Sequence, residues 1–163
     1  MNHSFYAWQG SVLLIEDSTE VSDLHQQFLE RAGCLVSVAT TLEEALRAMK
    51  TINYDCVVLD LELPDVSLED AEHGLSIAAL REVKVDLPIV VVTGYGQIPE
   101  TLAEDAAQAW ILKPVHPPEL LIHTVRCAVA YMAGVTETIQ RFAARSTYRR
   151  PAPTPDLAPV SIS

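Results

Sequence analysis

Short apolar runs alternate with helical patterns along most of the chain. Five of these runs are rich in β-branched residues and have the length of strands; they span residues 12–15, 35–39, 56–59, 88–92 and 110–112. Between them, apolar residues recur at the spacing of one helix face. Strands that alternate with helices are typical of an α/β fold, in which helices cover both faces of a parallel sheet. We therefore predict a doubly wound, five-stranded parallel sheet.

Five helices are predicted to follow these strands. The first ends at Gly33, since glycine commonly terminates helices. The second begins with the capping box Thr41-Leu42-Glu43-Glu44 and continues to Met49. The others are expected at residues 74–84, 100–107 and 118–145. The last helix is longer than is needed to cover a sheet.

The pattern divides the chain into one domain and its extensions. Residues 1–10 form an N-terminal extension, and residues 11–130 contain all five strands. Residues 131–147 are predicted to extend the last helix beyond the domain. Residues 148–163 are rich in proline and serine and have no periodicity, so we predict a disordered tail. There is no room for a second domain.

Charge and composition exclude several classes of partner. The net charge is −11, and the acidic excess lies in residues 1–125, which argues against a nucleic-acid partner. No apolar run has the length of a membrane span, and the N-terminus lacks a secretory signal pattern. We therefore expect a cytoplasmic protein with no membrane partner. Cys34, Cys56 and Cys127 lie in apolar neighbourhoods without metal-binding spacing, which predicts reduced thiols in the core.

Polar side chains follow four of the five predicted strands. Glu16 and Asp17 follow the first, Asp60 the third, Thr93 the fourth and Lys113 the fifth. Because the carboxyl ends of parallel strands lie along one edge of a sheet, these side chains are expected to meet in one pocket. Three carboxylates, a hydroxyl and an ammonium group can bind a divalent cation and transfer a phosphoryl group onto a carboxylate.

Each of these residues has a predicted role. Asp60 is the expected nucleophile, forming an acyl phosphate. Glu16, Asp17 and Asp60 are expected to bind Mg²⁺ or Mn²⁺, with the backbone carbonyl of Glu62 as a further ligand. Lys113 can pair with Asp60 at rest and with a phosphoryl oxygen afterwards.

Thr93 is the predicted switch residue, because its hydroxyl can donate to another phosphoryl oxygen and its loop can follow. That movement would convert a local reaction into a signal.

The residues at 13–17, 58–64, 91–94 and 112–114 together resemble the response-regulator receiver domain of bacterial two-component signalling. The resemblance covers about residues 10–130 and implies a flavodoxin-like (βα)5 fold. It also implies that Asp60 accepts phosphate from the histidine of a sensor kinase and that the Lys113–Pro114 bond is cis. Trp110 falls where the family carries its aromatic switch residue.

Two segments depart from the family pattern. Between Pro64 and Gly74 the chain carries about six residues more than the family pattern, in a segment rich in Asp and Glu, 65–73. We interpret this segment as a solvated loop; a second metal site or a partner contact is the alternative. The segment between Thr93 and Lys113 is shorter than is typical and lacks the usual Gly-Ala pair before the aromatic position. These departures concern the fourth helix, which is commonly part of the family's output surface.

The sequence therefore predicts a stand-alone receiver that acts as a phosphorylation-dependent switch. The phosphorylated state is expected to be recognised by a downstream protein partner or by a second copy in a homodimer, or the phosphoryl group is passed to a histidine phosphotransfer protein. The last helix offers a surface for a partner or a second copy beyond the domain. Catalysis is expected only on itself, in phosphorylation and autodephosphorylation. Two alternatives stay open, a receiver-fold module that signals without phosphate and a phosphatase of the haloacid dehalogenase type.

Overall fold

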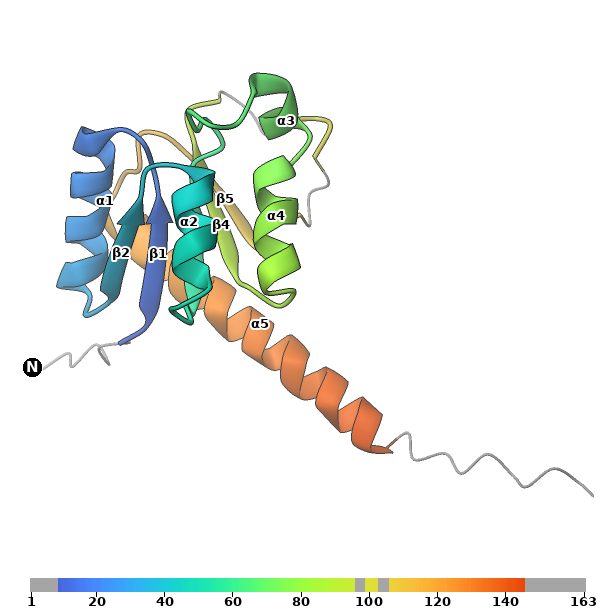
Figure 1. Cartoon of the computed structure of the whole chain (residues 1–163). Helices are drawn as coiled ribbons and strands as arrows, with labels where there is room; N and C mark the ends of the chain where they lie inside the picture. Colours follow the sequence, from blue (N-terminus) through green and yellow to red (C-terminus); the bar gives the residue numbers. More distant parts are fainter. Residues whose placement is uncertain (1–8, 96–98, 103–105, 146–163) are drawn as a thin grey trace, which may run out of the picture.

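The computed structural model describes residues 9–95, 99–102 and 106–145, and side chains as far as residue 137 (Figure 1). Most of the predicted N-terminal extension and the whole predicted tail lie outside the described residues. So do residues 146 and 147 at the end of the predicted helix extension.

Five parallel strands form one sheet in the order β2-β1-β3-β4-β5. Their bounds are β1 Ser11–Ile15, β2 Leu35–Ala39, β3 Cys56–Leu59, β4 Ile89–Thr93 and β5 Ala109–Leu112. This confirms the predicted α/β class, and the order is that of flavodoxin-like folds. The fourth strand lies one residue later than predicted, because Pro88 has no N–H to donate to the sheet, and Thr93 is its last residue.

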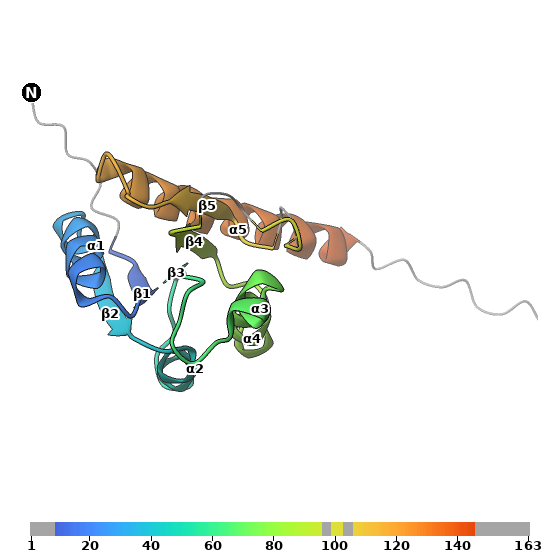
Figure 2. The same ribbon diagram turned by 90° about the horizontal axis from the view of Figure 1, so that it is seen from above.

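Helices cover both faces of this sheet. The helices are α1 Thr19–Arg31, α2 Leu42–Met49, α3 Leu68–Glu72, α4 Leu75–Val83 and α5 Glu119–Arg145. Seen from above, α1 and α5 lie on one side of the sheet, and α2, α3 and α4 on the other (Figure 2). The doubly wound arrangement predicted from the sequence is therefore present.

The core has two layers, one on each face of the sheet. Successive strand residues point to opposite faces, so Leu13 and Leu59 pack under α2 and α4, whereas Leu14 and Val58 pack under α1 and α5. All four are at most 1% exposed. Burial on both faces explains why the central strands are nearly continuous apolar runs instead of alternating apolar and polar residues.

The predicted start and end of α2 are both correct. The hydroxyl of Thr41 accepts a hydrogen bond from the N–H of Glu44 at 3.1 Å. The carboxylate of Glu44 in turn accepts a hydrogen bond from the N–H of Thr40 at 2.8 Å, one residue earlier than in the usual capping box. The N–H groups of Thr40 and Glu44 are thereby satisfied.

The acidic stretch 65–73, predicted to be a solvated loop, contains the short helix α3. Its cap is Ser67, whose hydroxyl accepts a hydrogen bond from the N–H of Asp70 at 3.1 Å. The acidic residues Glu69 and Asp70 lie in its first turn, where they stabilise a helix. Ala71 is buried at 2% exposure and fixes this helix to the core. The loop prediction was therefore wrong for this helix.

The helix predicted at 100–107 is absent from the described residues of that segment, which form turns and bends. Two backbone groups at the end of this segment bond to residues that are distant in the chain. The carbonyl of Ala106 accepts a hydrogen bond from the guanidinium of Arg81 at 3.1 Å, and the N–H of Gln108 donates to Ile89 at 2.9 Å. In the described residues, the fourth repeat of the predicted (βα)5 pattern thus has its strand and lacks its helix.

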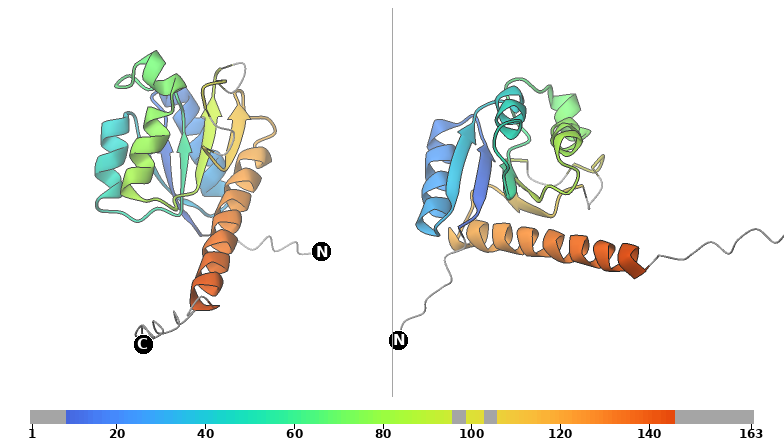
Figure 3. Two further views of the ribbon diagram at one scale, coloured as in Figure 1. Left: turned by 90° about the vertical axis from the view of Figure 1, so that its right-hand side faces the viewer. Right: turned by 60° about the horizontal axis from the view of Figure 1, so that its bottom comes forward.

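α5 begins one residue after the predicted start and extends through the predicted end at Arg145. Leu121, Val125 and Ala128 are buried against the sheet, and the C-terminal end of the helix extends beyond the domain (Figures 1 and 3). Its 27 residues correspond to about 40 Å of helix. Within the described part of the chain, no helix has the length and apolar character required to cross a membrane.

Two of the three cysteines match their prediction. Cys34 and Cys56 are buried, whereas Cys127 is exposed on α5. Its sulfur lies 3.6 Å from Nε2 of His123, one turn earlier. The prediction of a core thiol was wrong here, because position 127 falls outside the stripe of α5 that faces the sheet.

Gly74 is required where α3 meets α4. Its φ is +77°, and a Cβ atom there would lie 2.6 Å from Cδ2 of Leu102. We expect Gly74→Ala to lower the free energy of unfolding by about 1–3 kcal/mol, because it adds left-handed strain and a clash. Urea denaturation measures this. The control is Gly134→Ala on α5, where nothing lies within 4 Å, and equal destabilisation by both variants would contradict the account.

Candidate functional site

Backbone hydrogen bonds extend the sheet by one residue at its carboxyl edge and place the polar side chains there. The N–H of Glu16 donates to Ala39 at 3.0 Å, and the N–H of Asp60 donates to Ile15 at 2.9 Å. The N–H of Lys113 donates to the carbonyl of Thr93 at 2.8 Å. Residues far apart in the chain are therefore held side by side, as the sequence predicted for a parallel sheet.

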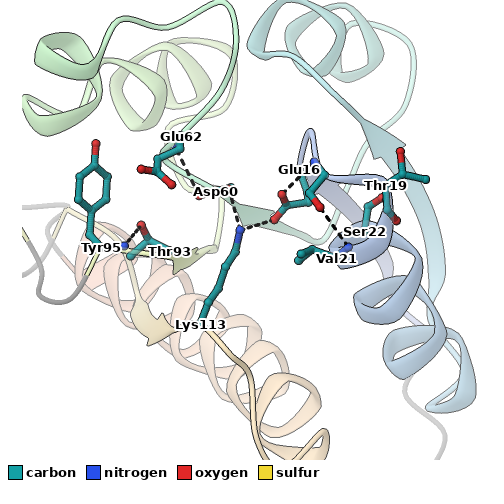
Figure 4. A network of polar contacts seen from close by, with 10 residues as sticks. Glu16, Thr19, Val21, Ser22, Asp60, Glu62, Thr93, Tyr95 and Lys113 are labelled. Carbon is teal, nitrogen blue, oxygen red and sulfur yellow. Dashed lines mark hydrogen bonds and ion pairs between the residues drawn. The ribbon is translucent and has the colours of Figure 1, made fainter.

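Lys113 links two buried carboxylates. Its Nζ lies 2.6 Å from Oε2 of Glu16 and 2.7 Å from Oδ2 of Asp60. The side chain of Glu16 is 2% exposed and that of Asp60 4%. Figure 4 shows the lysine reaching between the two acids from β5. The pairing of Lys113 with Asp60 expected from the sequence is present, and Glu16 is a second partner that the sequence did not indicate.

The pKa values follow from this packing. Burial raises the pKa of Glu16, and the nearby charge of Asp60 adds to the rise, while the hydrogen bond from Lys113 opposes it. Burial lowers the pKa of Lys113, but its hydrogen bonds with Asp60 and Glu16 outweigh burial and leave that pKa above its usual value. The ammonium group is therefore a fixed positive charge at neutral pH.

Three carboxylates at this edge have the geometry of a metal site. One oxygen each from Glu16, Asp17 and Asp60 lies within 4.8 Å of the other two. Glu16 and Asp60 are buried and Asp17 is exposed, so the cluster opens to solvent on one side. Hard divalent cations such as Mg²⁺ take oxygen ligands and keep several waters, so this donor set fits such an ion. The Glu62 carbonyl stays a predicted ligand.

Asp60 is held at both of its carboxylate oxygens. Oδ2 receives the Lys113 bond, and Oδ1 accepts a hydrogen bond from the N–H of Glu62 at 3.2 Å. These contacts fix the orientation of the carboxylate at the end of β3. A carboxylate that is oriented within an acidic cluster able to hold a cation can act as a nucleophile.

Thr93 and the residues after it border the site. The Thr93 side chain is buried, and its hydroxyl accepts a hydrogen bond from the N–H of Tyr95 at 3.2 Å. A Cβ atom on Gly94 would lie 3.5 Å from the carboxylate of Glu62. Burial raises the pKa of Tyr95, and Glu62 adds to the rise. The loop after β4 is therefore packed closely against the loop after Asp60 (Figure 4).

Trp110 lies in β5 opposite Val91 of β4. Its half-buried side chain packs against the core layer under α2 and α4. The next residue, Ile111, faces the opposite core layer, under α1 and α5. The role of Trp110 as the aromatic switch stays a prediction. The Lys113–Pro114 peptide bond is cis, as the family resemblance implied.

His25 is a buried residue near the site that the sequence reasoning passed over. It is 2% exposed on α1, and its Nδ1 has no hydrogen-bond partner among the described residues. Burial lowers its pKa to about 4, and the positive charge of Lys113 contributes. Its position one turn before the core residue Leu29 was the available signal that it faces inward.

Five parallel strands with an acidic cluster and a lysine at their carboxyl edge define a class of α/β protein that binds ligands at this edge. The family model for the response regulator receiver domain matches residues 12–125. The chain therefore belongs to the response regulator receiver domain family.

Two curated relatives extend this comparison. The cell cycle transcriptional regulator CtrA of Caulobacter vibrioides is 32% identical over 118 residues, which cover 70% of this chain and 49% of that protein. Protein PetR of Rhodobacter capsulatus is 30% identical over 113 residues, 68% of this chain and 45% of that protein. The chain spans about half the length of the curated relatives it matches.

Two solved structures have the same fold. A CheY-like response regulator receiver domain protein from Methanospirillum hungatei aligns with a TM-score of 0.68 at 23% identity, covering 78% of this chain and 98% of that one. The response regulator TrrA from Thermotoga maritima, solved in complex with Mg²⁺ and BeF, aligns with a TM-score of 0.64 at 26% identity. That alignment covers 74% of this chain and 99% of TrrA.

His25 predicts a specific pH dependence of stability. Between its ordinary pKa of 6.5 and its folded value of about 4, the unfolded chain binds more protons than the folded one, so stability falls as pH falls through this window. The contribution reaches about 2–3 kcal/mol near pH 4.5. Urea denaturation at pH 7 and pH 4.5 should show a smaller loss for His25→Leu than for the original protein.

The matched control for this titration is His123→Leu, which removes an exposed histidine from α5. It should leave the acid-induced loss of stability unchanged. A loss that is the same in the original protein and in both variants would show that His25 is not the group responsible.

Proposed function

We propose that this receiver domain is a phosphorylation-dependent switch in which Asp60 accepts a phosphoryl group from the histidine of a sensor kinase. The observation that carries the proposal is the Asp60 carboxylate itself. It is buried, it is bonded to a charged lysine, and it lies in a cluster of three carboxylates that can hold a divalent cation. A solitary aspartate at a strand end would not need these partners.

In the proposed step, one Asp60 oxygen attacks phosphorus and the bond from phosphorus to the donor nitrogen breaks. The electron pair of that bond leaves with the imidazole, and the product is an acyl phosphate. When bound, Mg²⁺ supplies positive charge to the phosphoryl oxygens. Lys113 keeps its 2.6 Å bond to Glu16 and turns its charge from Asp60 toward a phosphoryl oxygen.

Thr93 is the proposed responder to this new charge. Its hydroxyl accepts from the N–H of Tyr95 in the present state, so its own proton is available to a phosphoryl oxygen. If the hydroxyl turns toward that oxygen, its bond with Tyr95 is exchanged and the loop after β4 moves. Trp110 follows this movement as the proposed aromatic switch.

The proposed partners follow from the family. A sensor histidine kinase or a histidine phosphotransfer protein supplies or removes the phosphoryl group, and a downstream protein or a second copy reads it in the cytoplasm. No nucleic-acid or membrane partner is proposed for the described domain, which is acidic. Catalysis is confined to the domain's own phosphorylation and dephosphorylation, and family membership leaves the phosphatase alternative without support.

The direct test is phosphorylation by a small-molecule donor. Incubation with Mg²⁺ and acetyl phosphate should add the mass of one phosphoryl group, because the site itself performs the chemistry. Asp60→Asn should abolish the gain, whereas Asp86→Asn, on an exposed turn away from the cluster, should preserve it. A folded protein that gains no mass would favour the phosphate-independent module instead.

Metal binding is a separate prediction of the carboxylate cluster. Glu16→Gln and Asp17→Asn should each weaken Mg²⁺ binding by about tenfold or more, because each removes a charged oxygen ligand. Isothermal titration calorimetry measures the affinities, and Glu43→Gln on the exposed face of α2 is the control. Affinities that match the original protein in both site variants would place the ion elsewhere.

A further inference from the structure

The acidic stretch 65–73, called the insertion from here on, is in direct contact with residues 99–102, which follow the switch residue Thr93 in the chain. The hydroxyl of Thr101 donates a hydrogen bond to the backbone carbonyl of Glu72, the last residue of α3. The side chain of Leu102 lies against Gly74, which has no Cβ that would keep it away. In Figure 1, α3 lies at the carboxyl edge of the sheet, next to this segment.

This contact is part of the core. Leu102 is 9% exposed and belongs to the same buried cluster as Ala71 of α3 and Ile77 of α4. Tyr95, two residues after Thr93, packs against that cluster as well. Tyr95 and Leu102, on either side of positions 96–98, therefore pack against the same core layer, to which α3 contributes Ala71.

The start of the insertion is anchored to a different helix. The carboxylate of Asp65 accepts hydrogen bonds from the N–H groups of Leu42 and Glu43, each at 2.9 Å, and so caps the start of α2. Leu61 and Leu63, between Asp60 and this anchor, are buried in the same layer. The insertion thus joins the loop that carries the nucleophile to the segment that follows the switch threonine.

We infer that α3 and residues Pro99–Leu102 form a coupled unit that carries the phosphorylation state of Asp60 to the surface of the domain. The inference rests on the proposed function. When Thr93 and Tyr95 move, the segment that continues from them changes its contacts with Glu72 and Gly74, and α3 shifts. The described residues between β4 and β5 form turns and bends, so we assign the responsive surface to the insertion.

The surface around α3 and the start of α4 combines exposed apolar and acidic side chains. Leu68 is 60% exposed and Leu75 is 45% exposed, and the acidic residues Glu69 and Asp70 lie between them in the chain. A shift of α3 therefore alters how exposed apolar and acidic groups are presented together. Leu68, Glu69 and Asp70 of this face belong to the insertion, and Leu75 begins α4.

The test is amide NMR of the whole chain with Mg²⁺ and beryllofluoride, which substitutes for the phosphoryl group. The resonances of Thr93 and Tyr95 report on the switch, and those of residues 71–74 report on α3. Both sets should shift on addition. In Thr101→Val, which removes the hydroxyl and keeps the side-chain shape, the α3 shifts should fall by about half or more while the Thr93 shift persists.

Thr51→Val is the matched control, because the Thr51 hydroxyl makes the same kind of bond to the Ala48 carbonyl just after α2. This variant should leave the beryllofluoride-induced shifts of Thr93, Tyr95 and residues 71–74 unchanged. Leu102→Ala is a second variant and should reduce the α3 response as well. If Thr93 and Tyr95 respond and α3 does not, the coupling is overturned; if a folded protein shows no response anywhere, the proposed function fails and this inference fails with it.

Discussion

The contact of one ammonium group with two buried carboxylates is the interaction on which the site depends. Glu16 and Asp60 lie at the end of central strands, where water is largely excluded and like charges repel strongly. Lys113 lies within 2.7 Å of both, and its positive charge offsets their mutual repulsion. Burying three charged groups carries a desolvation penalty that can exceed their mutual attraction. We therefore attribute this arrangement to function and not to stability.

The rest of the fold holds these three groups in place. Each is positioned by a backbone bond that continues the parallel sheet, and the two apolar layers keep the strands in register. Because the acids and the lysine come from different strands, the site exists only when the sheet is complete. The same layers connect the site to its surroundings, through His25 on one face and the α3 insertion on the other.

Strong local periodicity explains what the sequence could predict. The strands, the bounds of α2 and the long last helix follow from apolar spacing and caps, and a parallel sheet then brings Glu16, Asp60 and Lys113 together. Long-range contacts explain what it missed. In the described residues between β4 and β5, turns and bends stand where a helix was predicted, and contacts such as the one between Arg81 and the Ala106 carbonyl are not recorded in any local pattern. His25 was missed because a polar residue type hid its inward-facing position.

Beryllofluoride binding followed by fluorine NMR tests the central claim most directly, since this anion binds where a carboxylate, a lysine and a divalent cation converge. We expect a bound fluorine signal that requires Mg²⁺ and disappears in both Asp60→Asn and Lys113→Ala. A folded protein that gives no bound signal, or one that persists without Asp60, would contradict the assignment of this cluster as a phosphoryl-accepting site.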